Sequence, residues 1–138
     1  MGPQEMKDAA RRFITGLFDE GNLALVEEMT TEGFSFFIPR PGVIPREALS
    51  EAVSGFRSAF ASIRNTYEEQ VAEGNVVVTR GTSHITQAPS PEGPGEAKTA
   101  SVPWVIFTRF EGDRIAENWE VWDEFGLMIQ LGAIPDPG

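Results

Sequence analysis

The order of hydrophobic patterns along the chain constrains its fold more than any other feature. Apart from a short strand-like run over 34–38, the first 63 residues carry apolar side chains at helical spacing, as in Met6, Phe13 and Leu17. From residue 65 onward, strand-like runs alternate with turn signals such as Glu73-Gly74-Asn75. Helices followed by hairpin-linked strands predict an α+β fold in which the helices pack on one face of an antiparallel sheet.

The same patterns predict the limits of the elements within one domain over residues 1–138. Helices are expected over 5–20, from Leu23 to about Met29, from Pro45 to about Ile63, and over 124–131. Strands are expected over 34–38, 65–72, 76–87, 99–110 and 114–122. Pro103 inside one of them indicates an edge or a bulge. Residues 88–95 are rich in Pro and Gly and predict an exposed loop, and residues 132–138 are expected to form a flexible tail.

Composition excludes several functional classes. The net charge is −10, which disfavours binding to nucleic acid. The chain has no cysteine, which removes disulfides and thiolate metal sites, and its single histidine argues against a zinc centre. No apolar run is long enough for a membrane helix, and the first residues lack a signal-peptide pattern, so we expect a cytoplasmic protein that does not contact membranes.

Apolar residues are expected on both faces of the sheet. Trp104, Val105, Ile106 and Phe107 are consecutive, whereas a strand with one solvated face would alternate. Something is therefore expected to cover the second face, and a partner subunit is one candidate.

The junction between the last strand and the last helix carries an acidic residue. Alternation places Ile115, Trp119, Val121 and Asp123 on one face. Asp123 either caps the following helix in solvent, or faces an apolar interior where burial raises its pKa and suits it to proton transfer. Glu120 is out of phase with Asp123 in this alternation, so it is not expected to supply a second inward acid.

Other candidate residues are weighed against ordinary structural roles. His84 suits proton shuttling, but an ordinary half-exposed strand histidine is the competing interpretation. The aromatic residues suit core packing one by one, and together suit a pocket for a flat or polycyclic ligand. The candidate ligand-contacting residues are Phe13, Leu17, Phe36, Phe56, Phe60, Trp104, Asn118 and Trp119. No nucleotide-binding glycine motif occurs.

Several segments resemble one known family. They are residues 19–29, 56–60, 71–78 and 107–117, followed by Trp119, Trp122-Asp123 and residues 126–132. The chain resembles the SnoaL-like polyketide cyclases, within the NTF2-like superfamily that includes ketosteroid isomerase. This resemblance implies a cone-shaped, curved mixed sheet wrapped around helices, an internal apolar pocket and a homodimer formed through the sheet.

The resemblance also implies chemistry without a cofactor or metal, in which an aspartate matching Asp123 acts as general acid/base in an intramolecular aldol closure. The chain departs from the family at Phe36-Phe37-Ile38-Pro39, where a polar Asp-His-Asp-Pro is frequent, and at Asn118, where His or Glu is frequent. We therefore predict an acid/base enzyme acting on a hydrophobic oxygenated natural-product intermediate, a polyketide cyclase or isomerase. A non-catalytic binding module and an epoxide-opening hydrolase or cyclase are the alternatives.

Overall fold

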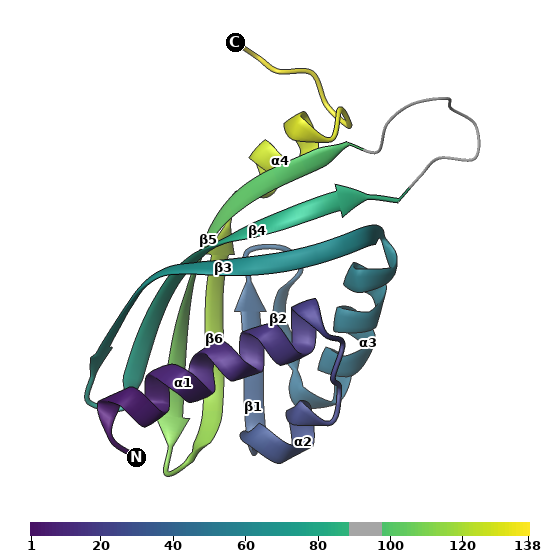
Figure 1. Ribbon diagram of the computed structural model, residues 1–138. Coiled ribbons are helices and arrows are strands. Elements are labelled where there is room, and N and C mark those ends of the chain that lie inside the picture. The colour runs from purple at the N-terminus through teal and green to yellow at the C-terminus, as the bar shows by residue number, and fades with distance from the viewer. Residues whose placement is uncertain (89–97) are drawn as a thin grey trace.

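The computed structural model describes residues 1–88 and 98–138 (Figure 1). The helical elements are α1 (Pro3–Ile14), the π-helical turn η1 (Thr15–Asp19), α2 (Leu25–Met29), α3 (Arg46–Ser58) and α4 (Glu124–Gln130). The strands are β1 (Thr30–Ile38), β2 (Gly42–Pro45), β3 (Phe60–Glu73), β4 (Val76–Gln87), β5 (Thr99–Glu111) and β6 (Arg114–Trp122). The predicted α+β class is confirmed. The loop predicted over 88–95 lies, from residue 89 on, outside the described residues.

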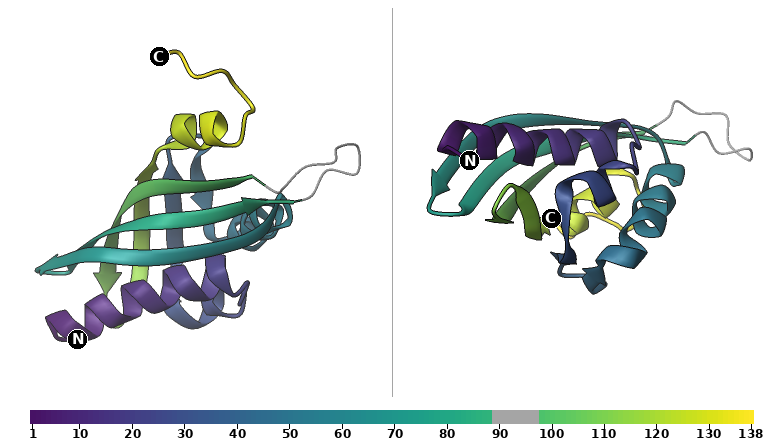
Figure 2. Two further views of the ribbon diagram at one scale, coloured as in Figure 1. Left: turned by 45° about the horizontal axis from the view of Figure 1, so that its top comes forward. Right: turned by 90° about the horizontal axis from the view of Figure 1, so that it is seen from below.

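The strands form one mixed sheet in the order β2-β1-β6-β5-β4-β3. β1 and β6 are parallel, and the other neighbouring pairs are antiparallel. The sheet curves strongly, and α1 lies across its concave side (Figure 1). α1 contacts β3 and β4, while α3 contacts β1, β2 and β3 (Figure 2). The helices therefore enclose the concave face. Within the described residues, no helix is long and apolar enough to cross a membrane.

Predictions in the first half of the chain differ from the structure at the end of α3, at the start of β1 and at β2. α3 ends at Ser58, and Phe60 to Ile63 open β3 instead of ending the helix. Ile63 pairs with Ile85 across the sheet and is buried there, so tertiary pairing overrides the helical spacing of its side chain. β2 was not predicted because the prolines around it indicate a break. It pairs with β1 at the edge of the sheet, where a proline is tolerated.

A β-bulge at Ala116 decides which side chains of β6 face inward. Ile115 pairs with Phe110 and Glu117 pairs with Arg109, which leaves Ala116 as the extra residue. The extra residue shifts the alternation by one position. Asn118 and Glu120 therefore face the concave side, and Trp119 faces the outside. The predicted common face of Ile115, Trp119, Val121 and Asp123 is wrong for this reason.

Pro103 lies inside β5, between β4 and β6 in the sheet. The main-chain N–H of Asp123 donates to the carbonyl of Pro103 at 3.2 Å, so the carbonyl and the ring nitrogen of Pro103 both face the β6 side. β6 has already ended at Trp122, and the missing N–H removes no bond from the β4–β5 ladder. The proline thus lies at a local edge within an interior strand.

The buried core divides into separate clusters around the concave face. A large cluster joins α1, α2 and α3 to the inner face of β1 and neighbouring strands, and it includes Phe13, Phe34 and Leu49. A second cluster lies where α4 packs on the sheet and includes Ile63, Val102 and Leu127. Because the helices leave the sheet open between these clusters, a hollow remains in the interior.

The outer face of the sheet carries a row of apolar side chains that crosses five strands. Paired positions bring Val71, Val78, Phe107, Trp119 and Phe37 next to one another in that order. Phe37 and Trp119 are stacked, with ring centroids 5.5 Å apart. Since Phe107 and Trp119 remain 43% and 39% exposed, this face is an unusually apolar surface for a single chain.

Candidate functional site

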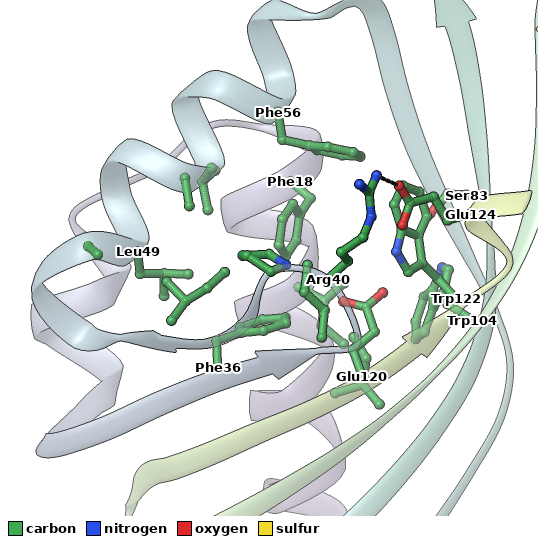
Figure 3. Close-up of a pocket in the computed structure, with 18 of the residues that line it drawn as sticks. Phe18, Phe36, Arg40, Leu49, Phe56, Ser83, Trp104, Glu120, Trp122 and Glu124 are labelled. Atoms are coloured by element: carbon green, nitrogen blue, oxygen red, sulfur yellow. Dashed lines mark hydrogen bonds and ion pairs between the residues drawn. The ribbon is translucent and has the colours of Figure 1, made fainter. Parts of the chain in front are cut away.

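The hollow inside the cone is a cavity of about 590 Å³. Its walls come from nearly every element, because α1, η1 and α3 close the space that the curved sheet leaves open. Figure 3 shows the phenylalanine rings on one side of the cavity, and the acidic side chains together with Trp104 and Trp122 on the other. The labelled wall residues are Phe18, Phe36, Arg40, Leu49, Phe56, Ser83, Trp104, Glu120, Trp122 and Glu124.

A group of edge-to-face aromatic rings forms the apolar part of the wall. The ring of Phe18 contacts those of Phe36 and Phe56 with centroids 6.0 and 6.1 Å apart, and Phe56 contacts Trp122 at 5.7 Å. Phe18 reaches this position from η1, where the wider π-helical turn follows α1. Rings that hold one another in this way give a flat ligand a rigid apolar surface.

Glu120 places a carboxyl group in this apolar wall. It projects from β6, pairs with Ile106 on β5, and faces the cavity (Figure 3). Burial raises the pKa of Glu120 from an ordinary 4.5 to about 8. Among the described residues, no hydrogen bond or charged neighbour contributes to this shift. The carboxyl is therefore mostly protonated at pH 7, and it presents an acidic O–H to the cavity.

A second polar group lies on β3, β4 and β5. The amide oxygen of Asn65 accepts hydrogen bonds from Ser83 Oγ at 2.6 Å and from Trp104 Nε1 at 3.0 Å. Asn65 in turn donates its main-chain N–H and its Nδ2 to the carboxylate of Asp19, at 2.9 and 2.6 Å. A Cβ at Gly81 would overlap the ring of Trp104, so glycine at this position allows the indole to lie flat on the sheet.

An ion pair lies at the rim of the cavity. The guanidinium of Arg40, in the turn between β1 and β2, contacts the carboxylate of Glu124 at the start of α4 (Figure 3). Both residues line the cavity, and the side chain of Arg40 is 78% exposed. Such an exposed pair contributes little stability, so it is easily opened.

The structure places Asp123 outside the cavity. Its side chain is exposed, and its Oδ1 accepts a hydrogen bond from the main-chain N–H of Gly126 at 2.8 Å. Asp123 is thus the N-cap of α4, which is the helix-cap interpretation given in the sequence analysis. The expectation that the carboxylate faces a dry interior is wrong, because the bulge at Ala116 reverses the alternation of β6.

His84 also lies outside the cavity. Its ring nitrogens contact Thr66 Oγ1 at 3.0 Å and Ser101 Oγ at 3.4 Å, on the neighbouring strands. The inward positions of β4 next to it are Ser83, which lines the cavity, and Ile85, which is buried. The half-exposed strand histidine is therefore the interpretation that fits its position.

The predicted ligand-contacting residues divide into three groups. Three of them line the cavity: Phe36, Phe56 and Trp104. Four pack elsewhere in the interior and do not reach it: Phe13, Leu17, Phe60 and Asn118. Trp119 lies on the outer face of the sheet, stacked on Phe37.

Sequence reasoning missed the polar residues of the cavity. Glu120 was set aside because it alternates with Asp123, and Asn65 and Ser83 are small polar residues in strands with no motif around them. The pairs Asn65–Ser83 and Ser83–Val102 form only when β3, β4 and β5 are in register. Within residues 1–88 and 98–138, no group of three or more His, Cys, Asp or Glu side chains is arranged to hold a metal ion.

The sequence matches the model of the SnoaL-like polyketide cyclase family over residues 8–131. The chain belongs to this family. A comparison with curated proteins found no match. The family assignment agrees with the cone-shaped sheet, and it covers every element that lines the cavity.

Solved structures described as candidate polyketide cyclases share this fold across nearly the whole chain. One from Acidithiobacillus ferrooxidans, described as a candidate polyketide cyclase, is 21% identical, with TM-score 0.80 and coverage of 94% of this chain and 95% of that one. One from Bacillus cereus with a similar description is 26% identical, with TM-score 0.78 and coverage of 94% and 82%. IdmH of Streptomyces antibioticus, also a candidate cyclase, is 20% identical, with TM-score 0.78 and coverage of 96% and 99%.

The departure of this SnoaL-like chain at the first strand falls on the cavity wall. Phe36 and Ile38 are the residues of β1 that line the cavity. Apolar side chains thus occupy positions where the resemblance leads us to expect polar ones. These apolar side chains line the same cavity as Glu120, whose pKa is raised by burial.

Proposed function

We propose that the protein is a cofactor-independent acid/base enzyme that cyclises or isomerises a hydrophobic, oxygenated natural-product intermediate. The observation that carries this proposal is the protonated carboxyl of Glu120 in the apolar cavity of a SnoaL-like protein. Membership in the family supports the reaction class, and the position of Glu120 supports the choice of the proton-transfer group in place of Asp123.

The size and lining of the cavity support a small polycyclic or prefolded substrate. A volume of about 590 Å³ falls within the range of roughly 300–1,000 Å³ that is typical of small-molecule sites. The rings of Phe18, Phe36 and Phe56 offer apolar faces to such a ligand. Holding a flexible chain in a folded shape lowers the entropic part of the barrier to ring closure.

Glu120 can carry out both proton transfers of an aldol closure. Its O–H donates to a ketone oxygen of the substrate as the carbon of an enol in the same molecule attacks the carbonyl carbon. A carbon–carbon bond forms, the carbonyl becomes a hydroxyl, and the enol becomes a ketone. The proton released from the enol oxygen passes to the Glu120 carboxylate, so the enzyme returns to its starting state and the product is an isomer of the substrate. The apolar walls favour the neutral carboxyl that starts this cycle.

The test compares Glu120→Gln with Asp123→Ala on a panel of linear and partly cyclised aromatic polyketides. Product formation is followed as a change in retention time at constant mass. Glutamine keeps the size and a hydrogen-bond donor but cannot transfer a proton, so we expect a loss of at least about 100-fold in turnover. Asp123→Ala should keep its turnover. The reverse pattern would contradict the assignment of Glu120.

The second candidate function is a non-catalytic binding module, which the apolar side chains at Phe36 and Ile38 favour. Such a protein would bind members of the same panel without changing their retention time. Glu120→Gln would then alter affinity alone. Conversion of any bound compound by the wild-type protein excludes this second candidate.

A further inference from the structure

In the polar group formed by Asp19, Asn65 and Ser83, each hydrogen bond has a fixed donor and acceptor. Ser83 donates to Asn65, and Asn65 donates to Asp19. A carboxylate only accepts hydrogen bonds, so the amide nitrogen of Asn65 must face Asp19, at 2.6 Å. The amide oxygen of Asn65 then faces the other way, toward Ser83 and Trp104. The orientation of this amide is therefore fixed by the charge of Asp19 and by the hydrogen bond from the Asn65 main-chain N–H at 2.9 Å.

This order leaves Ser83 with a single role toward the cavity. The indole of Trp104 can only donate, and it gives its N–H to the Asn65 oxygen at 3.0 Å. The Ser83 hydroxyl gives its one hydrogen to the same oxygen at 2.6 Å. The Ser83 oxygen is left with its lone pairs. It lines the cavity beside Asn65 and is half-buried there.

Ser83 and Glu120 therefore present opposite polarities to one ligand. Ser83 pairs with Val102 on β5, and Glu120 pairs with Ile106 four residues further along the same strand. The two side chains come from β4 and β6, which lie two strands apart. Two strand spacings combined with four residues along a strand separate their backbone positions by at most about 16 Å. Glu120 offers a proton to an oxygen acceptor, and Ser83 offers lone pairs to a donor.

We propose that Ser83 is a specificity-determining residue that accepts a hydrogen bond from a hydroxyl group of the substrate, at the opposite end from the carbonyl that Glu120 binds. This inference rests on the proposed function for the position of the carbonyl. Asn65 and Asp19 are positioning residues, because they hold the Ser83 hydrogen away from the ligand. The substrate class is thereby narrowed to hydroxylated, phenolic or enolic ketones. A methyl ether or a second ketone at this end would leave the Ser83 oxygen without a donor.

The test is a comparison of two probes that differ in one hydrogen-bond donor. The probes are 6-acetyl-2-naphthol and its methyl ether, and their affinities are measured by calorimetry for the wild-type protein and for Ser83→Ala. We expect the wild type to bind the naphthol about five- to tenfold more tightly than the ether. Ser83→Ala should remove this preference by weakening the naphthol alone. Ser83→Thr, which keeps the hydroxyl, should retain it.

Asp19→Asn tests the ordering itself. With an amide at position 19 the Asn65 side chain can turn, the Ser83 hydrogen is free to face the ligand, and the preference for the naphthol should fall although Ser83 is present. If Asp19→Asn does not fold, the Ser83 variants still decide. The proposal is overturned if wild type and Ser83→Ala prefer the naphthol over the ether to the same extent. It is also overturned if Ser83→Ala lowers the affinity for both probes equally.

The outcome is separable from that of the proposed function. A preference that depends on Ser83, in a protein that converts none of the polyketides, supports this inference and contradicts the enzymatic proposal. Turnover that depends on Glu120, together with a preference unaffected by Ser83→Ala, gives the opposite result.

Discussion

Replacing Glu120 by glutamine should make the protein more stable, and by an amount that depends on pH. The folded-state pKa of Glu120 is about 8, above its ordinary value of 4.5. Between these values the folded protein binds a proton that the unfolded chain does not. Stability therefore falls as pH rises from about 4.5 to about 8 and is constant, for this group, above that range. Glutamine has no proton to lose and removes this dependence.

The magnitude follows from the two pKa values. The raised pKa of Glu120 lowers the free energy of unfolding by about 1 kcal/mol at pH 5, about 3 kcal/mol at pH 7 and nearly 5 kcal/mol at pH 9. These values follow from about 1.4 kcal/mol per pKa unit. Glu120→Gln should raise the free energy of unfolding by these amounts. A residue that lowers the stability of its own fold is expected at a functional site rather than in a purely structural wall.

Urea unfolding followed by tryptophan fluorescence at pH 5, 7 and 9 measures the difference between the two proteins. The other ionisable groups cancel in this difference. Glu51→Gln is the matched control, because Glu51 is an exposed acid that also lines the cavity. It should keep the pH dependence of the wild type. A Glu120→Gln variant whose stability parallels the wild type from pH 5 to 9 would show that Glu120 is not a buried, protonated acid.

Three further predictions concern the pH–rate profile, the helix cap and the outer face. Since the protonated carboxyl of Glu120 starts the reaction, turnover should be flat below about pH 8 and fall tenfold per pH unit above it; a rate that rises through pH 8 would identify Glu120 as a base instead. Asp123→Ala should lower the free energy of unfolding by about 1 kcal/mol without changing turnover, as chemical denaturation and product assays can check; lost turnover at unchanged stability would restore a catalytic role. We expect two copies to associate through the apolar row around Trp119, which Arg109 and Glu117 flank with opposite charges, so Trp119→Lys should convert a dimer to a monomer in light scattering. A wild-type protein that is monomeric at micromolar concentration would contradict this.

Much of the fold was predictable because it depends on local patterns. The helical spacing of Met6, Phe13 and Leu17 sets the buried side of α1 and η1, and the Glu73-Gly74-Asn75 turn joins β3 to β4 as predicted. The consecutive apolar residues of β5 do supply both faces of the sheet, with Trp104 buried inside and Phe107 on the outer face. These patterns extend over many residues, so a wrong assignment of one residue does not change the predicted element.

The site was less predictable because single positions decide it. One extra residue in β6 turned Asp123 outward and Glu120 inward, and nothing in the strand's composition marks where that residue lies. Phe56 lines the cavity and Phe60 does not, because the chain changes from helix to strand between them. An alternation argument carries through a whole strand, so one displaced residue reverses every side chain that follows it.

By itself, the sequence determined the family and the α+β layout, since periodicity and composition are averages over the chain. Only the tertiary structure decided that Glu120 is the desolvated acid and that the Ser83 oxygen keeps lone pairs free to accept a hydrogen bond. Those properties belong to the register between β3, β4, β5 and β6. The pKa of Glu120 and the direction of the Ser83 hydroxyl arise from neighbours that are distant along the chain, so they exist only once the sheet has closed around the cavity.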